Sequence, residues 1–477
     1  MNSFAVLPND VKKNGMGILG MGVSGMAVLR WLVGKYPALG IRIPLVLRDK
    51  NPALSCPSFL ARRPLTVCRF GEKWLENIEE KVLFRSPVIR PDLPALQKAV
   101  RQGTILTSEM ALTDRLCPAV RFTVTGSDGK TSTVSMLHKI LTAVGEKEGF
   151  SAFLGGNIGT PLLEQVEQMR PKDCAVFELS SFQLMDCFPK SRVATVLNLT
   201  QNHLDVHTSF EEYIDAKTHI FKNAEKKVIQ AECPYTLDFL KKGDVICTHT
   251  HSVEEVRKAF GNHPTVWLHG DQVCYTEGNA TEYLFSRADL QVAGAYQLYN
   301  AMTAAAMLYP FVSSSDIRAG LSRFHGVAHR LQKVAALGDV VCYDSAIDTT
   351  PARVHATLSS FSGKPTVICG GSDKGLDYLP LAKTLLAHAG RVVVTGDTAK
   401  AIFEALEHLF ATEGKAIPVY REKRFADGVK KAVEITPKGE ALVLSPGCAS
   451  FDEFANYKAK SASFSDILKS LGAKPIS

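Results

Sequence analysis

At 477 residues the chain is too long for a single hydrophobic core, which predicts about three domains. Charged residues make up 22% and hydrophobic residues 45%, a composition that excludes a disordered chain. The formal net charge is +7 without a long basic run, so the charge favours anionic small molecules such as nucleotides over nucleic acid as partners.

The cysteines and the apolar segments predict the compartment. The 11 cysteines are scattered without a C-x-x-C pair, which favours reduced thiols in a cytosol over disulfides or a zinc site. The first 13 residues lack the apolar segment of a signal peptide. Residues 301–312 are the most apolar later stretch, but they are too short to cross a bilayer and include Thr303 and Pro310. We therefore expect a cytoplasmic protein with no membrane partner.

The first predicted domain begins with a glycine loop. A short buried strand at residues 16–19 runs into Gly20, Gly22 and Gly25, and a helix follows. This pattern is typical of a loop that approaches a diphosphate, but the glycines could also serve only tight packing between strand and helix. NAD and another nucleotide diphosphate are both possible ligands of such a loop.

Further strands complete this first domain. A strand at residues 43–47 ends next to Asp49, whose carboxylate could meet a ribose. Strand-like runs at residues 81–84 and 104–106 follow. They predict that the domain closes near residue 112.

The second predicted domain begins with a phosphate loop. An alternating run that ends near Val124 leads into Gly126 and Gly129, and Lys130 and Thr131 then open an amphipathic helix. Loop amides and a helix N-terminus bind anions, the lysine reaches the outer phosphates, and the hydroxyl after it can bind Mg²⁺. The glycine of a standard P-loop would stand at position 124, so the loop departs from that pattern. An ordinary turn before a helix is the less favoured alternative.

Polar residues after the next strands add to this site. A strand at residues 174–177 ends in Glu178, which we predict to face Thr131 as a Mg²⁺ ligand, with a surface carboxylate as the alternative. A strand at residues 193–199 leads to His203 and His207. This pair lacks the glutamate and the third ligand of a zinc site, so loop histidines of a nucleotide site are the preferred interpretation.

The helix predicted at residues 210–223 carries Lys217. Judged from the residues alone, Lys217 would be a solvated charge on that helix. Residues 265–268 and 273–275 predict a hairpin. Asn300, in an Ala-rich helix, could contact an adenine edge or merely pack.

The third predicted domain repeats one pattern. Short apolar strands at residues 340–343, 366–369, 391–395 and 441–444 are mostly followed by a Gly/Ser loop and a helix. This predicts a doubly wound sheet with its loops along one edge. Lys374 on such an edge suits an anionic substrate, and a surface lysine in a turn is the alternative.

Seven motifs, in their order and spacing, resemble those of the Mur ligases, in particular the MurD type. They are T-G-S-D-G-K-T (125–131), G-G-N-I-G-T-P-L (155–162), E-L-S-S-F-Q-L (178–184), H-L-D-V-H with Y-I-D-A-K (203–217), H-R (329–330), G-G-S-D-K-G (370–375) and S-P-G-C-A-S-F-D-E-F (445–454). The resemblance covers essentially the whole chain. E-L-S-S-F-Q-L and S-P-x-C-A-S-F-D are much more specific than the phosphate loop.

The resemblance implies an α/β fold with three domains. A Rossmann-like N-terminal domain at residues 1–112 would hold the UDP group, which replaces NAD as the expected ligand of the glycine loop. A central P-loop ATPase-type domain with a parallel or mixed sheet would span residues 113–328. A doubly wound Rossmann-like C-terminal domain at residues 329–477 would supply the amino-acid site. We expect a monomer.

The implied reaction is the ATP-dependent addition of D-glutamate to UDP-N-acetylmuramoyl-L-alanine in peptidoglycan synthesis, through an acyl phosphate. ATP would be bound by Gly126, Ser127, Asp128, Gly129, Lys130, Thr131, Ser132, Asn300, Arg330 and Asp344. Two Mg²⁺ ions would be held by Thr131, Glu178, His203 and Lys217, the last as a carbamate, with Lys130, His203 and Lys217 as the catalytic residues. The substrates would contact Gly22, Val23, Ser24, Asp49, Asn157, Thr349 (or Thr350), Lys374, Ser450, Phe451 and Tyr457.

The sequence departs from the family pattern at Asn202, Ala346 and Val88, where the family often has Asp, Lys and Gly. These departures concern substrate positioning more than phosphoryl transfer. The rival interpretations are another Mur ligase, a folylpolyglutamate synthetase, and a nucleotide-binding protein without ligase activity. E-L-S-S-F-Q-L and the N-terminal Rossmann-like segment argue against the first two.

Overall fold

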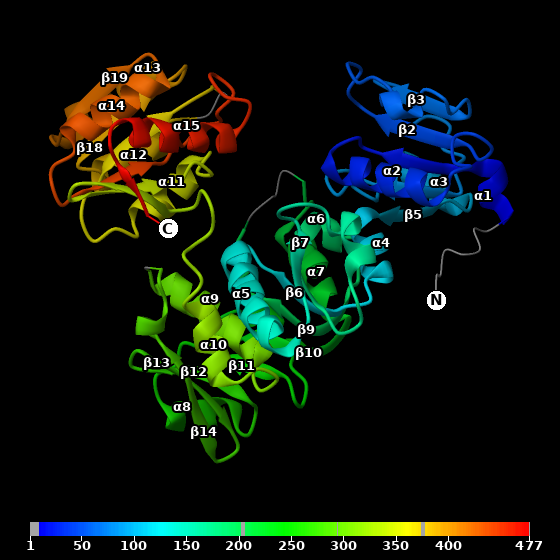
Figure 1. Ribbon diagram of the computed structural model, residues 1–477, viewed down its shortest axis with the longest axis horizontal. Coiled ribbons are helices and arrows are strands. Elements are labelled where there is room, and N and C mark those ends of the chain that lie inside the picture. The colour runs from blue at the N-terminus through cyan, green and yellow to red at the C-terminus, as the bar shows by residue number, and fades with distance from the viewer. Residues whose placement is uncertain (1–8, 202–205, 293, 374–376, 477) are drawn as a thin grey trace. The chain divides into compact units, whose positions relative to one another are not determined.

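The computed structural model describes residues 9–201, 206–292, 294–373 and 377–476, which belong to two compact units. Unit 1 comprises Met1–Gln291 and Ala295–Phe324, and unit 2 comprises Val292–Gly294 and His325–Ser477. Unit 1 contains two sheets and unit 2 contains one (Figure 1). The three sheets agree with the predicted three-domain α/β fold. The exact domain bounds stay predictions, and the bound at residue 112 falls inside helix α4 (Glu109–Leu116).

The first sheet is parallel, with the strand order β3-β2-β1-β4-β5 of a nucleotide-binding α/β fold. Its strands are β1 (Met16–Leu19), β2 (Leu45–Asp49), β3 (Thr66–Phe70), β4 (Val82–Arg85) and β5 (Ile105–Ser108). Its helices are α1 (Asn9–Asn14), α2 (Val23–Lys35), α3 (Pro94–Arg101) and the 3-10 turn η1 (Ser58–Leu60). The strand predicted at residues 43–47 is therefore shifted by two residues, so Asp49 ends β2.

The central sheet has nine strands in the order β14-β13-β12-β11-β10-β9-β6-β8-β7. They are β6 (Val120–Thr125), β7 (Ala152–Gly156), β8 (Cys174–Glu178), β9 (Lys190–Val196), β10 (Asn223–Gln230), β11 (Val245–Cys247), β12 (Thr265–His269), β13 (Gln272–Glu277) and β14 (Ala280–Ser286). The strands β6 to β12 pair in parallel, whereas β13 pairs antiparallel with both β12 and β14. The hairpin predicted near residue 270 is confirmed.

Helices cover this mixed sheet. They are α4, α5 (Lys130–Glu148), α6 (Ser181–Leu184), α7 (Phe210–Thr218), α8 (Val253–Phe260), α9 (Ala295–Leu308) and α10 (Ser314–Leu321), with the 3-10 turns η2 (Leu162–Glu164), η3 (Val166–Gln168), η4 (His219–Phe221), η5 (Pro234–Phe239) and η6 (Arg287–Asp289). Helix α7 is shorter than predicted, because the chain turns through η4 and enters β10 at Asn223.

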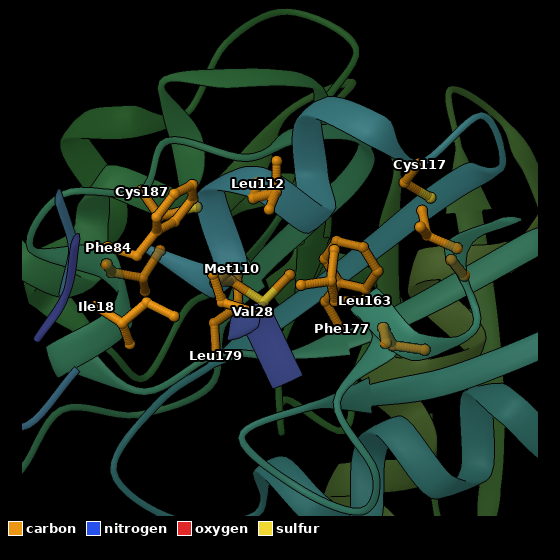
Figure 2. Packing of buried hydrophobic residues seen from close by; sticks show 14 of the residues in the cluster. Ile18, Val28, Phe84, Met110, Leu112, Cys117, Leu163, Phe177, Leu179 and Cys187 are labelled. Atoms are coloured by element: carbon orange, nitrogen blue, oxygen red, sulfur yellow. The ribbon is translucent and has the colours of Figure 1, made fainter. Parts of the chain in front are cut away.

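A hydrophobic cluster joins the two sheets of unit 1 (Figure 2). It combines residues of β1, α2 and β4 with residues of α4, η2 and β8, including Ile18, Val28, Phe84, Met110, Leu112, Leu163 and Phe177. All of these side chains are nearly excluded from water, so the cluster stabilises the contact between the sheets.

Unit 2 is built on a seven-stranded sheet in the order β19-β18-β17-β20-β16-β15-β21. Its strands are β15 (Gln332–Leu337), β16 (Val340–Asp344), β17 (Thr366–Gly370), β18 (Arg391–Thr395), β19 (Val419–Glu422), β20 (Ala441–Leu444) and β21 (Lys474–Pro475). Strands β16 to β20 are parallel, and β15 is antiparallel to its neighbours. The helices α11 (Pro351–Leu358), α12 (Leu379–His388), α13 (Ala399–Glu413), α14 (Phe425–Ile435) and α15 (Tyr457–Ser470) pack on it (Figure 1). The predicted doubly wound sheet is confirmed.

No helix in the described ranges is long and apolar enough to span a membrane.

Candidate active site

The phosphate loop connects the central strand β6 to helix α5. Gly129 caps the helix with a φ of +81°, a backbone conformation that glycine adopts without strain. A Cβ atom at Gly129 would also lie 2.4 Å from Oδ1 of Asn300. Helix α9 therefore packs directly against the loop, and the structure brings Asn300 to the predicted nucleotide site.

Lys130 lies at the first position of α5, as predicted. Its ammonium group donates hydrogen bonds to the carbonyl oxygens of Gly126 and Ser127, each at 2.8 Å. Ser127 itself is bonded through its hydroxyl to Tyr213 at 2.9 Å, and the Asp128 amide donates to Asn198 at 2.8 Å. These contacts fix the loop in front of the helix N-terminus, where backbone amides attract phosphate.

Glu178 ends β8 next to the phosphate loop. Its Oε2 accepts a hydrogen bond from the Thr131 hydroxyl at 2.8 Å, and its Oε1 accepts one from the Asn157 amide at 3.0 Å. A carboxylate and a hydroxyl in contact are donors that suit Mg²⁺, which usually takes few protein ligands and keeps waters and phosphate oxygens. Within the described part of the chain, no group of three His, Cys, Asp or Glu side chains forms a metal cage. The Thr131 and Glu178 pair fits a phosphate-bound Mg²⁺.

Lys217 is not a solvated charge, so that interpretation was wrong. Its side chain is 2% exposed and donates to the Gly126 carbonyl oxygen at 2.8 Å and to the Thr125 hydroxyl at 3.2 Å. The ammonium nitrogen also lies 4.8 Å from the ring centroid of Tyr213. Helix α7 packs on the loop through this face, which removes Lys217 from water. Burial, and then the charge of Lys130, hold the pKa of Lys217 well below its usual value.

The structure describes one of the two predicted loop histidines. His203 lies outside the described residues, as does the departure at Asn202. His207 is buried and bonds through Nε2 to the Ser181 hydroxyl at 2.9 Å, and its ring stacks on Phe182 at 5.6 Å. His207 therefore ties the loop before α7 to the start of α6.

The glycine loop of the first sheet contacts Asp49. The Asp49 carboxylate accepts hydrogen bonds from the Met21 amide at 2.7 Å and the Asn51 amide at 2.9 Å. A Cβ atom at Gly25 would lie 1.9 Å from the Gly20 carbonyl oxygen, so packing alone requires that glycine. At Gly22 a Cβ atom would meet nothing within 4 Å.

The neighbouring candidate positions of this first sheet are open to solvent. Val23 is 73% exposed and Ser24 is partly exposed. Val88, the departure from the family's glycine, is 71% exposed.

In unit 2, Asp344 ends β16 and is buried. His329 bonds to its Oδ2 through Nδ1 at 2.9 Å, and the Ser461 hydroxyl donates to the same oxygen at 2.5 Å. Arg330 follows His329 and is partly exposed. Thr349 is partly exposed, while its neighbour Asp348 is buried and accepts a hydrogen bond from the Ser445 hydroxyl at 2.8 Å.

The candidate amino-acid pocket follows β20 in the same unit. Ser450 is 2% exposed, and its Oγ has no hydrogen-bond partner among the described residues. Phe451 beside it is 68% exposed, and Tyr457 lies edge-on to His329 with the ring centroids 5.8 Å apart. Lys374 lies outside the described residues. A buried hydroxyl without a partner is unusual, and a bound carboxylate would satisfy it.

Two arginines that the sequence did not single out connect the sheets of unit 1. Arg85 is buried and pairs with Asp186 at 2.7 Å, and Arg90 makes a two-pronged pair with Glu212 at 2.6 and 3.1 Å. A charged residue at the end of a buried strand was the available signal for Arg85. The position of Arg90 in a loop carried no comparable signal.

Comparisons with known proteins show which family the chain resembles. A family model described as the Mur ligase middle domain matches residues 124–308. A UDP-N-acetylmuramoylalanine–D-glutamate ligase of Clostridium novyi is 32% identical over 98% of this chain and 99% of that protein. The protein of the same name from Acetivibrio thermocellus is 33% identical over 97% of this chain and 98% of that protein.

Solved structures give the same fold. The UDP-N-acetylmuramate-alanine ligase MurC of Thermotoga maritima matches with a TM-score of 0.56 at 17% identity, covering 96% of this chain and 99% of that one. MurF of Acinetobacter baumannii matches with a TM-score of 0.53 at 18% identity, covering 77% and 82%. Identities this low bear on the fold alone, whereas the sequence relatives span nearly the whole chain at more than 30% identity. The chain therefore belongs to the Mur ligase family of ATP-dependent amide ligases, whose members use ATP and Mg²⁺.

Proposed function

We propose that this protein joins D-glutamate to UDP-N-acetylmuramoyl-L-alanine at the expense of ATP, as a step of peptidoglycan synthesis. The observation that carries the proposal is the identity of 32% over 98% of the chain to a ligase of that name. The contacts of Lys130, Thr131 and Glu178 support the ATP half of the reaction. Another Mur ligase activity is the alternative that the experiment below distinguishes.

The first step activates a carboxylate. An oxygen of the alanyl carboxylate attacks the γ-phosphorus of ATP, the bond to ADP breaks, and an acyl phosphate forms. Lys130 and the amides at the start of α5 would hold the phosphates during this transfer. Thr131 and Glu178 would hold Mg²⁺, which neutralises the negative charge on the phosphate oxygens.

The second step forms the amide. The neutral amine of D-glutamate attacks the acyl carbon, a proton leaves the nitrogen, and inorganic phosphate departs from the tetrahedral intermediate. We propose that Lys374 and Ser450 bind the two carboxylates of D-glutamate, with Phe451 and Tyr457 as apolar walls. Thr349 or Thr350 would make a further contact to substrate. The unsatisfied hydroxyl of Ser450 supports this assignment.

We further propose that Lys217 is carbamylated. A neutral lysine amine adds to CO₂ and releases one proton, which converts a cation into an oxygen ligand. Burial and the nearby Lys130 favour the neutral amine that this reaction needs. His203 and the carbamate would then hold the second Mg²⁺.

The remaining assignments follow from the same family. Asp49 and the loop at Gly22, Val23 and Ser24 would bind the UDP group, and Asn157 would contact the sugar peptide. Asn300, Arg330 and Asp344 would contact the nucleotide of ATP. We propose that the protein is cytoplasmic and monomeric. Light scattering, which measures the mass of the particle in solution, tests whether it is a monomer.

The test is phosphate release with UDP-N-acetylmuramoyl-L-alanine as the acyl substrate, measured across D-glutamate, L-glutamate, L-alanine and meso-diaminopimelate. We expect release only with D-glutamate. Release only with L-alanine or meso-diaminopimelate would assign a different ligase activity. NAD binding without any amino-acid-dependent release would overturn the proposal.

A further inference from the structure

A buried lysine that the proposed reaction does not use lies in unit 2. Lys460, in helix α15, is 1% exposed and donates a hydrogen bond of 2.7 Å to the carbonyl oxygen of Gly370. Its ammonium nitrogen also lies 5.1 Å from the ring centroid of Phe425. Burying an ammonium group costs free energy unless hydrogen bonds and nearby charges compensate for the lost water, so we asked which groups Lys460 contacts.

Lys460 holds the junction of two loops. Gly370 is the last residue of β17, and its amide donates to the Pro446 carbonyl oxygen, in the loop after β20, at 2.7 Å. Two residues further, the Ser372 amide donates to the Ala449 carbonyl oxygen at 2.9 Å. The loop after β17 and the loop after β20 therefore run together next to the Lys460 ammonium group.

Both loops carry the proposed amino-acid pocket. The loop after β17 leads to Lys374, and the loop after β20 carries Ser450. The Phe451 amide donates to the Ser372 hydroxyl at 3.3 Å, which places Ser450 beside this crossing. Oγ of Ser450 and Oδ1 of Asp452 are both buried and have no hydrogen-bond partner among the described residues.

In the part of the chain that the structure describes, two carboxyl groups and two thiols act on the charge of Lys460. Burial lowers the pKa of Lys460, and Asp452, Cys448, Cys369 and Glu453 act in the opposite direction. Burial raises the pKa of both thiols, which favours their neutral form. Among the described residues, Lys460 is therefore the basic side chain of this cluster, and it faces the carboxyl groups of Asp452 and Glu453 and the thiols of Cys369 and Cys448.

We propose that Lys460 is a positioning residue of the amino-acid pocket. Its ammonium group fixes the loops after β17 and β20 in the arrangement that presents Ser450 to an acidic amino acid. It also supplies positive charge next to these two loops. This inference rests on the proposed function for the identity of the amino acid. The structural part of the inference, that Lys460 holds the loops after β17 and β20 together, does not depend on that function.

The first test uses no substrate. Hydrogen–deuterium exchange is measured on the intact protein for peptides that contain residues 371–373 and 446–452, in the wild type and in Lys460→Met. We expect faster exchange of both segments in Lys460→Met, and no change in the control Lys469→Met, an exposed lysine of the same helix. Unchanged exchange in a folded Lys460→Met protein would contradict the clamp.

The second test measures turnover. We expect Lys460→Met to raise the KM for D-glutamate about tenfold or more, with the KM for ATP changed less than roughly twofold, because only the amino-acid loops move. Lys460→Arg should restore most of the affinity. An unchanged KM for D-glutamate in Lys460→Met would overturn the inference, whereas a wild type without D-glutamate-dependent turnover would overturn the proposed function instead.

If Lys460→Met does not fold, the pH dependence of the KM for D-glutamate tests the role of the Lys460 charge. Because the lysine pKa is lowered, the wild type loses this charge as pH rises, whereas the guanidinium of Lys460→Arg stays charged. The ratio of the KM for D-glutamate in the wild type to that in Lys460→Arg should therefore increase toward alkaline pH. Titration of the D-glutamate amine cancels in this ratio, and a ratio independent of pH would contradict the role of the charge.

Discussion

The ammonium nitrogen of Lys217 lies 2.8 Å from the carbonyl oxygen of Gly126, the first glycine of the phosphate loop. Lys130 donates to the same oxygen at 2.8 Å. Two lysines on one carbonyl, one of them buried, repel each other, which is a physical reason for one of them to be neutral. The shared oxygen therefore connects α7 to the phosphate loop that we propose binds ATP.

Lys217→Ala is expected to lose nearly all ligase activity, because the side chain that would become the carbamate is gone. A short-chain carboxylic acid added to this variant should restore part of the activity by occupying the vacated space with a carboxylate. Lys217→Arg should stay inactive, since a guanidinium does not form the carbamate. The control is Lys222→Ala, an exposed lysine of the following turn, and full activity of Lys217→Ala would disprove the carbamate.

Gly129→Ala should impair ATP use. The added Cβ atom would collide with Asn300 Oδ1, which would push α9 away from the phosphate loop. We expect the KM for ATP to rise about tenfold or more. Gly243→Ala is the matched control, because Gly243 also has a positive φ but a Cβ atom there would meet nothing within 4 Å. Both variants lose a similar amount of stability from backbone strain, about 1 kcal/mol, so equal KM values for ATP would contradict the collision.

Arg85→Met should destabilise the contact between the two sheets of unit 1. The variant leaves the Asp186 carboxylate without its cation, and Oδ1 of Asp186 is buried without a hydrogen-bond partner in the described structure. We expect a loss of about 3 kcal/mol in the free energy of unfolding, measured by urea titration. Arg30→Met removes an exposed pair with Glu164 and should cost less than about 1 kcal/mol. Equal losses of unfolding free energy in the two variants would contradict the expectation that the buried Arg85 pair stabilises the protein more than the exposed Arg30 pair.

Glu212 should make the free energy of unfolding decrease at acidic pH. The hydrogen bonds from Arg90 lower the pKa of Glu212 to about 2, while the unfolded chain has the ordinary glutamate pKa of about 4.3. A depressed pKa in the folded state gives a stabilisation that is complete above the unfolded pKa and is lost as pH falls from about 4 to about 2.

The difference in unfolding free energy between the wild type and Glu212→Gln should therefore shrink over that pH range. Glu225→Gln, in an exposed pair with Arg192, is the control and should show little pH-dependent difference. A difference for Glu212→Gln that stays constant down to low pH would rule out this linkage.

The strands and the phosphate loop could be predicted from the sequence because their signals are local. Short apolar runs followed by glycine loops gave β6, β17, β18 and β20 to within about two residues. Helix α7 ended early, because its last predicted residues join η4 and then pair into β10, which a helical pattern does not reveal.

The contacts of the site depend on long-range packing and could not be predicted in the same way. The burial of Lys217 comes from the contact of α7 with a loop some 90 residues earlier in the chain, and that of Lys460 from a contact with Gly370 at a separation of 90 residues. A charged side chain looks solvated in a sequence until its tertiary neighbours are known. The motifs predicted that Glu178 faces Thr131, and the pairing of β6 with β8 brings these two residues into contact.

The most direct measurement of the central claim is isotope transfer. UDP-N-acetylmuramoyl-L-alanine labelled with ¹⁸O in the alanyl carboxylate is incubated with the protein, ATP, Mg²⁺ and D-glutamate, and the phosphate is analysed by mass spectrometry. The account predicts that each phosphate carries one carboxylate oxygen, because that oxygen forms the bond to phosphorus and leaves with it. Phosphate that contains no ¹⁸O while the amide forms would contradict carboxylate activation by ATP at this site.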